Sequence, residues 1–177
     1  LSYRCWGEGS PTVILESGLG NTLQVWQDVV PGIAATTRVC AYNRAGVGDS
    51  GKPRPGRTTK SWAQDLHTLL SRARIGGPYI LVGHSAGGIS SRWFQELYPN
   101  GVLGTVLGES STPGDMQRQM AMRPDEAVAF YDNLKNWRLW VAQTDPAKWP
   151  EGMDVLKEDA ESPALGSLGN LPLTVLT

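Results

Sequence analysis

The glycine-flanked serine at residues 83–87, with the sequence Gly-His-Ser-Ala-Gly, constrains this chain more than any other stretch. The apolar run 78–82 before it predicts a buried strand, and residues 88–98 after it predict a helix that ends at Pro99. A serine at such a strand–turn–helix junction has its hydroxyl pushed out above the end of the sheet. It needs glycine neighbours because the strands and the helix approach too closely for side chains. We therefore predict that Ser85 is a nucleophile; the alternative is a chance match to a short pattern.

Strand-like and helix-like segments alternate along most of the chain. This alternation predicts a mainly parallel sheet with helices on both faces and an active site at the carboxyl ends of the strands. The first two strands have only a short turn between them, so a hairpin is expected there. Pro31 lies inside the first helical pattern and is expected to kink or end it, and Ser61 with Gln64 fits a capping box for the next helix. The expected strands are 1–6, 11–16, 37–42, 78–82, 102–107 and 171–177.

Three further segments have the order and spacing of a known family. They are Glu16–Gly20, Tyr42–Ser50 and Val106–Glu109, which flank the serine motif in the sequence. With them the chain resembles the α/β-hydrolase superfamily over nearly its whole length. The resemblance implies the α/β fold of that family, a mainly parallel sheet flanked by helices, with a helical lid inserted after the strand that follows the serine motif.

The segment expected to form the lid has no clear strand and shows helical patterns at 125–141 and 153–160. Trp137 and Trp140 are predicted to line the substrate pocket; alternatively, they pack the lid against the body of the protein. The predicted division is an α/β-hydrolase core at 1–111, a lid at 112–170 and a core strand at 171–177, after which the family has a last strand and helix.

The composition is that of a globular protein and excludes several classes of partner. Of the 177 residues 40% are hydrophobic and 19% charged, and the net charge is −1. No basic cluster interleaved with aromatic residues is present, which argues against nucleic acid as a partner. No run approaches the roughly 18 apolar residues of a membrane span. No spacing of His, Cys or carboxylate residues resembles a ligand set, so neither a metal nor another cofactor is predicted.

The two cysteines, Cys5 and Cys40, lie in separate strand-like runs. The resemblance implies that these strands are neighbours, so a disulfide can form between them. A disulfide would imply an exported protein, and two buried thiols would fit a cytoplasmic one. The sequence alone leaves both alternatives, and with them the localisation, open.

Acyl transfer by a serine needs donors for the oxyanion and a base for the serine proton. The backbone N–H of Ala86, next to the nucleophile, is one expected donor, and the resemblance implies that the N–H of Leu19 is the other. Neither histidine suits the role of base. His84 precedes Ser85 and should face the opposite side of the strand, whereas His67 is expected on a helix that covers the flank of the sheet.

In the family, the histidine follows the last strand and the acid follows the strand before it, so the resemblance places both beyond Thr177. We therefore interpret the 177 residues as C-terminally incomplete, by truncation or in a nicked protein whose missing segment is a separate chain; a natural pseudoenzyme would give the same sequence. Glu109, at the end of a strand, is a possible acid within the chain, but a structural role is favoured. Arg44 is expected to anchor its loop.

These interpretations together predict a serine hydrolase for an ester or a related acyl substrate, a small molecule with an apolar part. Ser85 would attack, and Leu19 and Ala86 would hold the oxyanion. A serine at this position leaves open amidase, peptidase, thioesterase, lyase and perhydrolase chemistry. The alternatives are a non-catalytic module that binds a ligand in the same pocket, and an inactive fragment.

Overall fold

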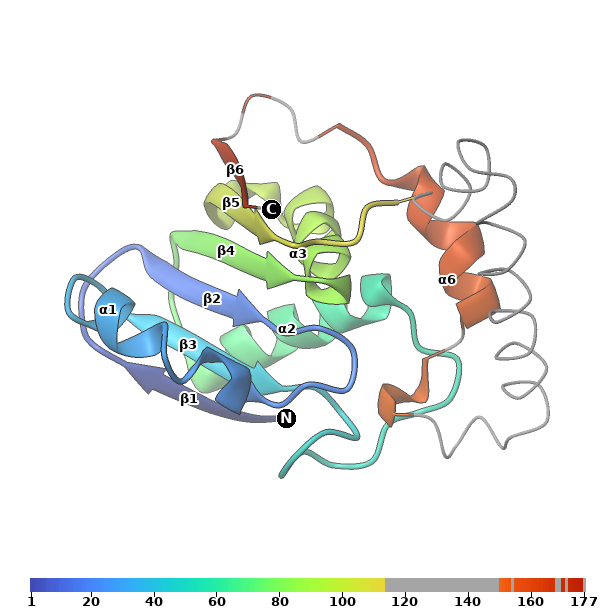
Figure 1. Cartoon of the computed structure of the whole chain (residues 1–177), viewed down its shortest axis with the longest axis horizontal. Coiled ribbons are helices and arrows are strands. Elements are labelled where there is room, and N and C mark those ends of the chain that lie inside the picture. Colours follow the sequence, from blue (N-terminus) through green and yellow to red (C-terminus); the bar gives the residue numbers. More distant parts are fainter. Residues whose placement is uncertain (114–149, 154, 168–169, 171, 177) are drawn as a thin grey trace.

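A computed structural model describes residues 1–113, 150–153, 155–167, 170 and 172–176. Its centre is a six-stranded sheet in the order β1-β3-β2-β4-β5-β6 (Figure 1). Strand β1 is antiparallel to β3, and the other neighbouring strands are parallel. The predicted α/β class is therefore confirmed. The strands are β1 (Ser2–Trp6), β2 (Thr12–Glu16), β3 (Val39–Asn43), β4 (Tyr79–His84), β5 (Val102–Gly108) and β6 (Leu173–Leu176).

Helices cover both faces of the sheet, as the alternation of strands and helices predicts. On one face, α2 (Thr59–Ala73) and α3 (Ala86–Leu97) pack against strand residues such as Ile14 and Leu81. On the other face, α1 (Val30–Ala34) lies over Val13 and Leu15. Successive residues of β2 thus enter different cores, because strand side chains alternate between the two faces. This explains why every position of β2 is buried.

The expected hairpin between the first two strands is wrong. Strand β1 instead pairs with β3, with Ser2 opposite Asn43 and Trp6 opposite Val39. Strand β2 has parallel neighbours on both sides, β3 and β4, so it offers β1 no free edge. The antiparallel strand therefore lies at the border of the sheet, where one edge can remain unpaired.

Two details of the helices also differ from the sequence prediction. Pro31 neither kinks nor ends a helix; it lies in the first turn of α1, where its missing N–H would have no partner in any case. The pattern before it is a separate 3₁₀ turn, η1 (Leu23–Trp26). The capping box of α2 is formed by Thr58 and Ser61, so Ser61 is the third residue of the helix and not its cap.

Part of the predicted lid lies within the described residues. Helix α6 (Val155–Glu161) confirms the helical pattern at 153–160, and it is flanked by the 3₁₀ turns η4 (Pro150–Gly152) and η5 (Ser162–Ala164). Carboxylate oxygens of Glu158 accept hydrogen bonds from the N–H of Thr59 at 2.7 Å and from its hydroxyl at 2.6 Å, which ties α6 to the start of α2. Trp137, Trp140 and the pattern at 125–141 lie outside the described residues, so their roles stay predictions.

None of the helices that the structure describes combines the length and the apolar character that crossing a membrane requires. The remaining 3₁₀ turn of the core, η2 (Pro99–Gly101), follows α3 and leads directly into β5.

Cys5 and Cys40 are directly opposite one another on β1 and β3 and form a disulfide. We expect the double substitution Cys5→Ala with Cys40→Ala to lower the free energy of unfolding by about 4 kcal/mol, because the disulfide closes a long loop in the unfolded chain. Urea unfolding with and without reductant measures this difference. The reductant should lower the midpoint of the original protein and leave the double variant unchanged; equal midpoints for the original protein would contradict the prediction.

Candidate functional site

Ser85 occupies the sharp turn between β4 and α3, as the sequence predicts. Its backbone has φ 52° and ψ −128°, a conformation that residues with side chains rarely adopt. Such strain persists only where the surrounding structure enforces it, and it is concentrated at functional sites. The turn leaves Ser85 partly exposed, while most residues of the helix after it are buried.

The glycines around Ser85 are required by close packing. A side-chain carbon on Gly83 would lie 2.5 Å from the Cα of Gly88, and one on Gly87 would lie 2.5 Å from the carbonyl oxygen of Ser17. Both neighbours are backbone atoms that cannot move aside without displacing α3 or the loop after β2. The sequence-based reason for the glycines is thereby confirmed, and the start of α3 is pressed against the end of β2.

The loop 17–20 follows β2 and lies beside Ser85. A side-chain carbon on Gly18 would be 3.2 Å from both the Cβ of Ser85 and the Nδ1 of His84. The N–H of Asn21 donates to the carbonyl of Gly18 at 3.2 Å, and Gly20 has φ +75°, so residues 18–21 form a tight turn that needs glycine at its third position. Among the described residues, neither the N–H of Leu19 nor that of Ala86 has a hydrogen-bond acceptor.

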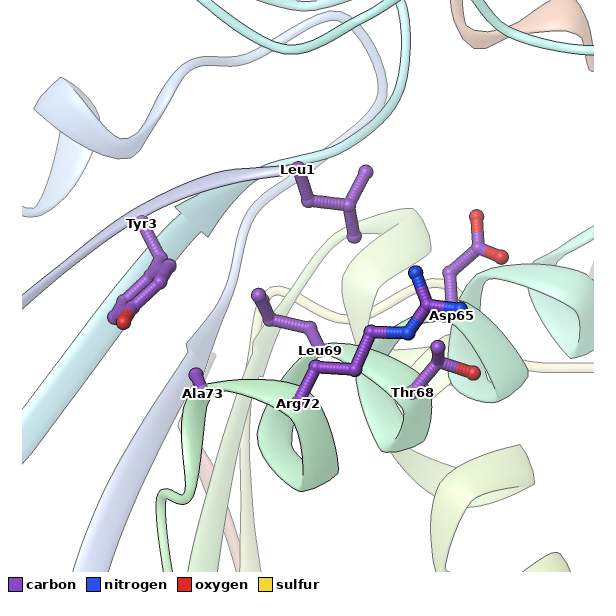
Figure 2. A pocket seen from close by; sticks show the side chains of 7 residues that line it. All are labelled: Leu1, Tyr3, Asp65, Thr68, Leu69, Arg72 and Ala73. Carbon is purple, nitrogen blue, oxygen red and sulfur yellow. The ribbon is translucent and has the colours of Figure 1, made fainter.

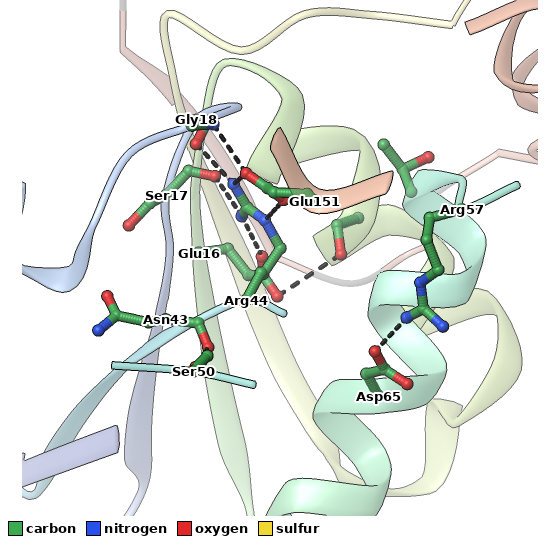
Figure 3. Close-up of polar contacts among 12 residues, drawn as sticks. Glu16, Ser17, Gly18, Asn43, Arg44, Ser50, Arg57, Asp65 and Glu151 are labelled. Carbon is green, nitrogen blue, oxygen red and sulfur yellow. Dashed lines mark hydrogen bonds and ion pairs between the residues drawn. The ribbon is translucent and has the colours of Figure 1, made fainter. Parts of the chain in front are cut away.

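Arg44, the first residue after β3, lies at the centre of a buried polar cluster (Figure 3). Its side chain is only 4% exposed, yet it contacts groups from three parts of the chain. It donates to the carbonyls of Ser17 at 2.6 Å and Gly18 at 2.5 Å. It also pairs with Glu16 at 3.3 Å and with Glu151, through both Nε and Nη2. The predicted anchoring role thus extends beyond its own loop to the loop beside Ser85.

The electrostatics of this cluster follow from one guanidinium facing two buried carboxylates. Burial raises the pKa of Glu16 to about 7, against the attraction of Arg44 and the hydrogen bond from Tyr42. Burial alone would lower the pKa of Arg44, but its hydrogen bond and ion pair with Glu151 and its attraction to Glu16 raise that pKa above its ordinary value. Burial, followed by the charge of Glu16, raises the pKa of Tyr42. Arg44 therefore stays charged, whereas Glu16 can take up a proton near neutral pH.

The described residues provide Ser85 with no histidine partner. The ring of His84 lies near Gly18, but no hydrogen bond joins it to Ser85 among the described contacts. His67 is exposed on α2 and stacks on Tyr98, with ring centroids 3.9 Å apart. It lies on the flank of the sheet, as predicted.

Glu109 directly follows the last residue of β5, has φ +41° and is exposed. Its N–H donates to the carbonyl of Leu176 at 2.9 Å, but no described residue pairs with its carboxylate. The next residues do contact the nucleophile turn, because the N–H of Ser111 donates to the carbonyl of Ser85 at 3.2 Å. Glu109 therefore follows the strand position paired with the residue before Ser85, and its carboxylate has no partner among the described residues.

Sequence reasoning missed two members of the cluster. Glu16 was identified only as part of a family segment, although a glutamate at the end of an otherwise apolar strand signals a buried partner. Glu151 carries no comparable signal, because it belongs to a short turn 107 residues from Arg44 in the chain. Only the folded chain brings it to the loop beside Ser85.

A hollow of about 450 Å³ lies elsewhere, between the start of β1 and α2 (Figure 2). Strands β3 and β2 separate β1 from β4, so this hollow is remote from Ser85. The lining residues of the hollow are Leu1, Tyr3, Asp65, Thr68, Leu69, Arg72 and Ala73.

Within the described ranges, no group of three or more His, Cys, Asp or Glu residues could hold a metal ion.

Comparisons with known proteins agree with the fold described above. Residues 11–171 match the family model described as alpha/beta hydrolase fold. The RutD protein of Yersinia enterocolitica, whose name assigns it carbamate hydrolase activity, is 36% identical over 171 residues, which are 91% of this chain and 59% of RutD. The Bacillus subtilis protein YqjL is 26% identical over 97% of this chain and 63% of its own length. The chain thus spans about three fifths of the length of these two relatives.

Solved structures share the fold. Cfl2 from Burkholderia cenocepacia superposes with a TM-score of 0.71 at 22% identity, covering 98% of this chain and 74% of that one. The enol-lactonase from Burkholderia xenovorans gives a TM-score of 0.60 at 17% identity, covering 98% of this chain and 76% of that one. At these identities the similarity establishes the fold alone.

The raised pKa of Glu16 predicts a pH dependence of stability. The folded protein binds a proton at Glu16 as pH falls through about 7, and the unfolded chain does so only near 4.5. Between these two pH values the folded state holds more protons than the unfolded chain, so proton binding at Glu16 stabilises the fold. This contribution to the free energy of unfolding is complete below pH 4.5 and is lost as pH rises through 7. Glu16→Gln should therefore show a smaller fall in the free energy of unfolding between pH 5 and 8.

Urea unfolding at a series of pH values measures this effect, and Glu8→Gln, at an exposed glutamate, is the matched control. If Glu16→Gln and the original protein have parallel pH profiles, Glu16 does not titrate in this range.

Proposed function

The chain belongs to the α/β-hydrolase fold family, and we propose that it forms the nucleophile-bearing part of a serine hydrolase for an ester or a related acyl compound with an apolar part. The observation that carries this proposal is the strained turn at Ser85, together with the N–H groups of Leu19 and Ala86, which have no acceptor within the part of the chain that the structure describes. Unpaired N–H groups beside a partly exposed serine suit a site where negative charge develops on a substrate oxygen.

In the proposed reaction the Oγ of Ser85 attacks the carbonyl carbon of the substrate. The N–H groups of Leu19 and Ala86 donate to the oxygen that becomes negatively charged, and the alcohol or other leaving group departs as the acyl-enzyme forms. Water then attacks the acyl-enzyme and releases the acid. The attack by Ser85 requires a base that takes the serine proton, and we propose a histidine that follows Thr177 in the complete protein, because neither His67 nor His84 bonds to Ser85.

The acid that orients this histidine would also follow Thr177, and Glu109 is the alternative within the chain.

The names of two similar proteins indicate the general class of bond that is cleaved, but not the substrate. RutD is named for a carbamate, and the Burkholderia xenovorans protein is named for an enol-lactone. Both compounds are attacked at an acyl carbon, which is the chemistry that Ser85 would perform. Trp137 and Trp140 are proposed to line the acyl pocket.

We expect Ser85→Ala in the complete protein to abolish labelling by a fluorophosphonate probe and to lower kcat for p-nitrophenyl esters by at least about 10³-fold, since the nucleophile is lost. Mass spectrometry of the labelled protein and ester, lactone and carbamate assays measure these effects. Ser71→Ala, at an exposed serine of α2, is the matched control and should behave like the original protein.

Full activity of Ser85→Ala would refute the nucleophile assignment. A complete protein that binds acyl compounds but neither labels nor turns them over would support the alternative, a non-catalytic binding module.

A further inference from the structure

The orientation of the peptide between Gly18 and Leu19 is set by Arg44. Its Nη2 donates to the carbonyl of Gly18 at 2.5 Å, and its Nη1 donates to the carbonyl of Ser17 at 2.6 Å. A trans peptide is planar, and its C=O and N–H point in opposite directions. With the Gly18 carbonyl directed at the guanidinium, the N–H of Leu19 must therefore point away from Arg44, which is what a donor to a substrate oxygen requires.

The next peptide of the turn is held by Glu151. The N–H of Gly20 donates to Oε1 of Glu151 at 2.7 Å, and the same oxygen accepts from Nη2 of Arg44 at 3.0 Å. Glu151 therefore contacts both the turn and the guanidinium (Figure 3). Its own position is fixed, because its side chain is 1% exposed and the N–H of Arg57 donates to the carbonyl of the adjacent Gly152 at 2.9 Å.

These contacts are strong constraints on a turn that would otherwise be adaptable. The turn contains two glycines, and Leu19 between them is 38% exposed, so packing of side chains does little to fix it. Hydrogen bonds from a buried guanidinium and to a buried carboxylate are charge-assisted, and the fork of Arg44 matches two successive carbonyls.

We propose that Arg44 and Glu151 are positioning residues for the oxyanion hole: together they aim the N–H of Leu19 at the substrate oxygen. Neither side chain touches the substrate in this account. Because Glu151 belongs to η4, the conformation of the loop 17–20 also depends on the position of that turn. This inference rests on the proposed function, since it assigns how one of the two oxyanion donors is held.

The test uses the complete protein and three variants. Arg44→Lys keeps the charge but loses the planar fork whose two nitrogens meet the two carbonyls. Glu151→Ala removes the acceptor of the Gly20 N–H, and Glu151→Gln keeps the shape but loses the charge. Arg72→Lys is the matched control, because Arg72 is an exposed residue of α2 and lines the hollow near the start of β1, remote from Ser85.

We expect Arg44→Lys and Glu151→Ala to lower kcat for a p-nitrophenyl ester about 10- to 100-fold with KM changed less than about threefold, because a misplaced donor affects the transition state and not substrate binding. Affinity for a trifluoromethyl ketone, which forms an oxyanion on Ser85, should weaken by the same factor as kcat. Glu151→Gln should show a smaller loss in both quantities, and Arg72→Lys none.

A purely structural role predicts a different pattern, in which the activity loss follows the unfolded fraction measured by circular dichroism and the folded remainder keeps its ketone affinity. That result, or unchanged kcat in the folded variants, would overturn the inference. If Arg44→Lys does not fold, the kcat and the ketone affinity of Glu151→Gln, compared with those of Arg72→Lys, test the inference by the same criteria. Failure of the proposed function is recognised separately, because the original protein would then show no activity that depends on Ser85.

Discussion

The burial of the Arg44 guanidinium is the constraint on which the rest of the site depends. A buried charge is tolerated only when partners replace the lost water, and removing one partner of a buried pair costs about 3–5 kcal/mol. Arg44 finds its partners in Glu16 of β2, the carbonyls of the loop after β2, and Glu151 of η4, and its guanidinium carbon lies 4.2 Å from the centre of the Trp62 ring. One side chain thereby joins the sheet, the loop beside Ser85, α2 and the segment that precedes α6.

The two sides of the candidate site are held by different physical means. Steric contact fixes the nucleophile side, because Gly83 and Gly87 allow backbone to meet backbone and leave Ser85 no relaxed conformation. Charge-assisted hydrogen bonds fix the side that carries Leu19. The side with Ser85 depends on five consecutive residues, 83–87. The side with Leu19 needs residues from distant parts of the chain, so its hydrogen bonds form only when the sheet and η4 have assembled.

This difference explains what the sequence could and could not predict. The turn at Ser85, the alternating strands and helices and the place of His67 follow from local patterns, and the structure agrees with them. The local pattern wrongly predicted a hairpin of β1 with β2, and only the family resemblance placed β1 beside β3, because this pairing depends on which strands are already flanked on both sides. The cap at Thr58 was missed because several hydroxyl residues precede α2, and the local pattern fits more than one of them. Glu151 could not be identified as a member of the cluster, since no local sequence pattern around it indicates a contact with Arg44.

Charge balance determines how the cluster can coexist with a site for an oxyanion. Two carboxylates share one guanidinium, so full ionisation would bury a net negative charge beside the loop 17–20. The raised pKa of Glu16 indicates that this carboxyl takes up a proton near neutral pH, which removes the excess negative charge. Arg44 and Glu151 then form a balanced pair that holds the turn, and Tyr42 with Ser90 supplies hydroxyls to Glu16. A further negative charge near the Leu19 N–H would oppose the oxyanion, so a protonated Glu16 favours both the core and the proposed chemistry.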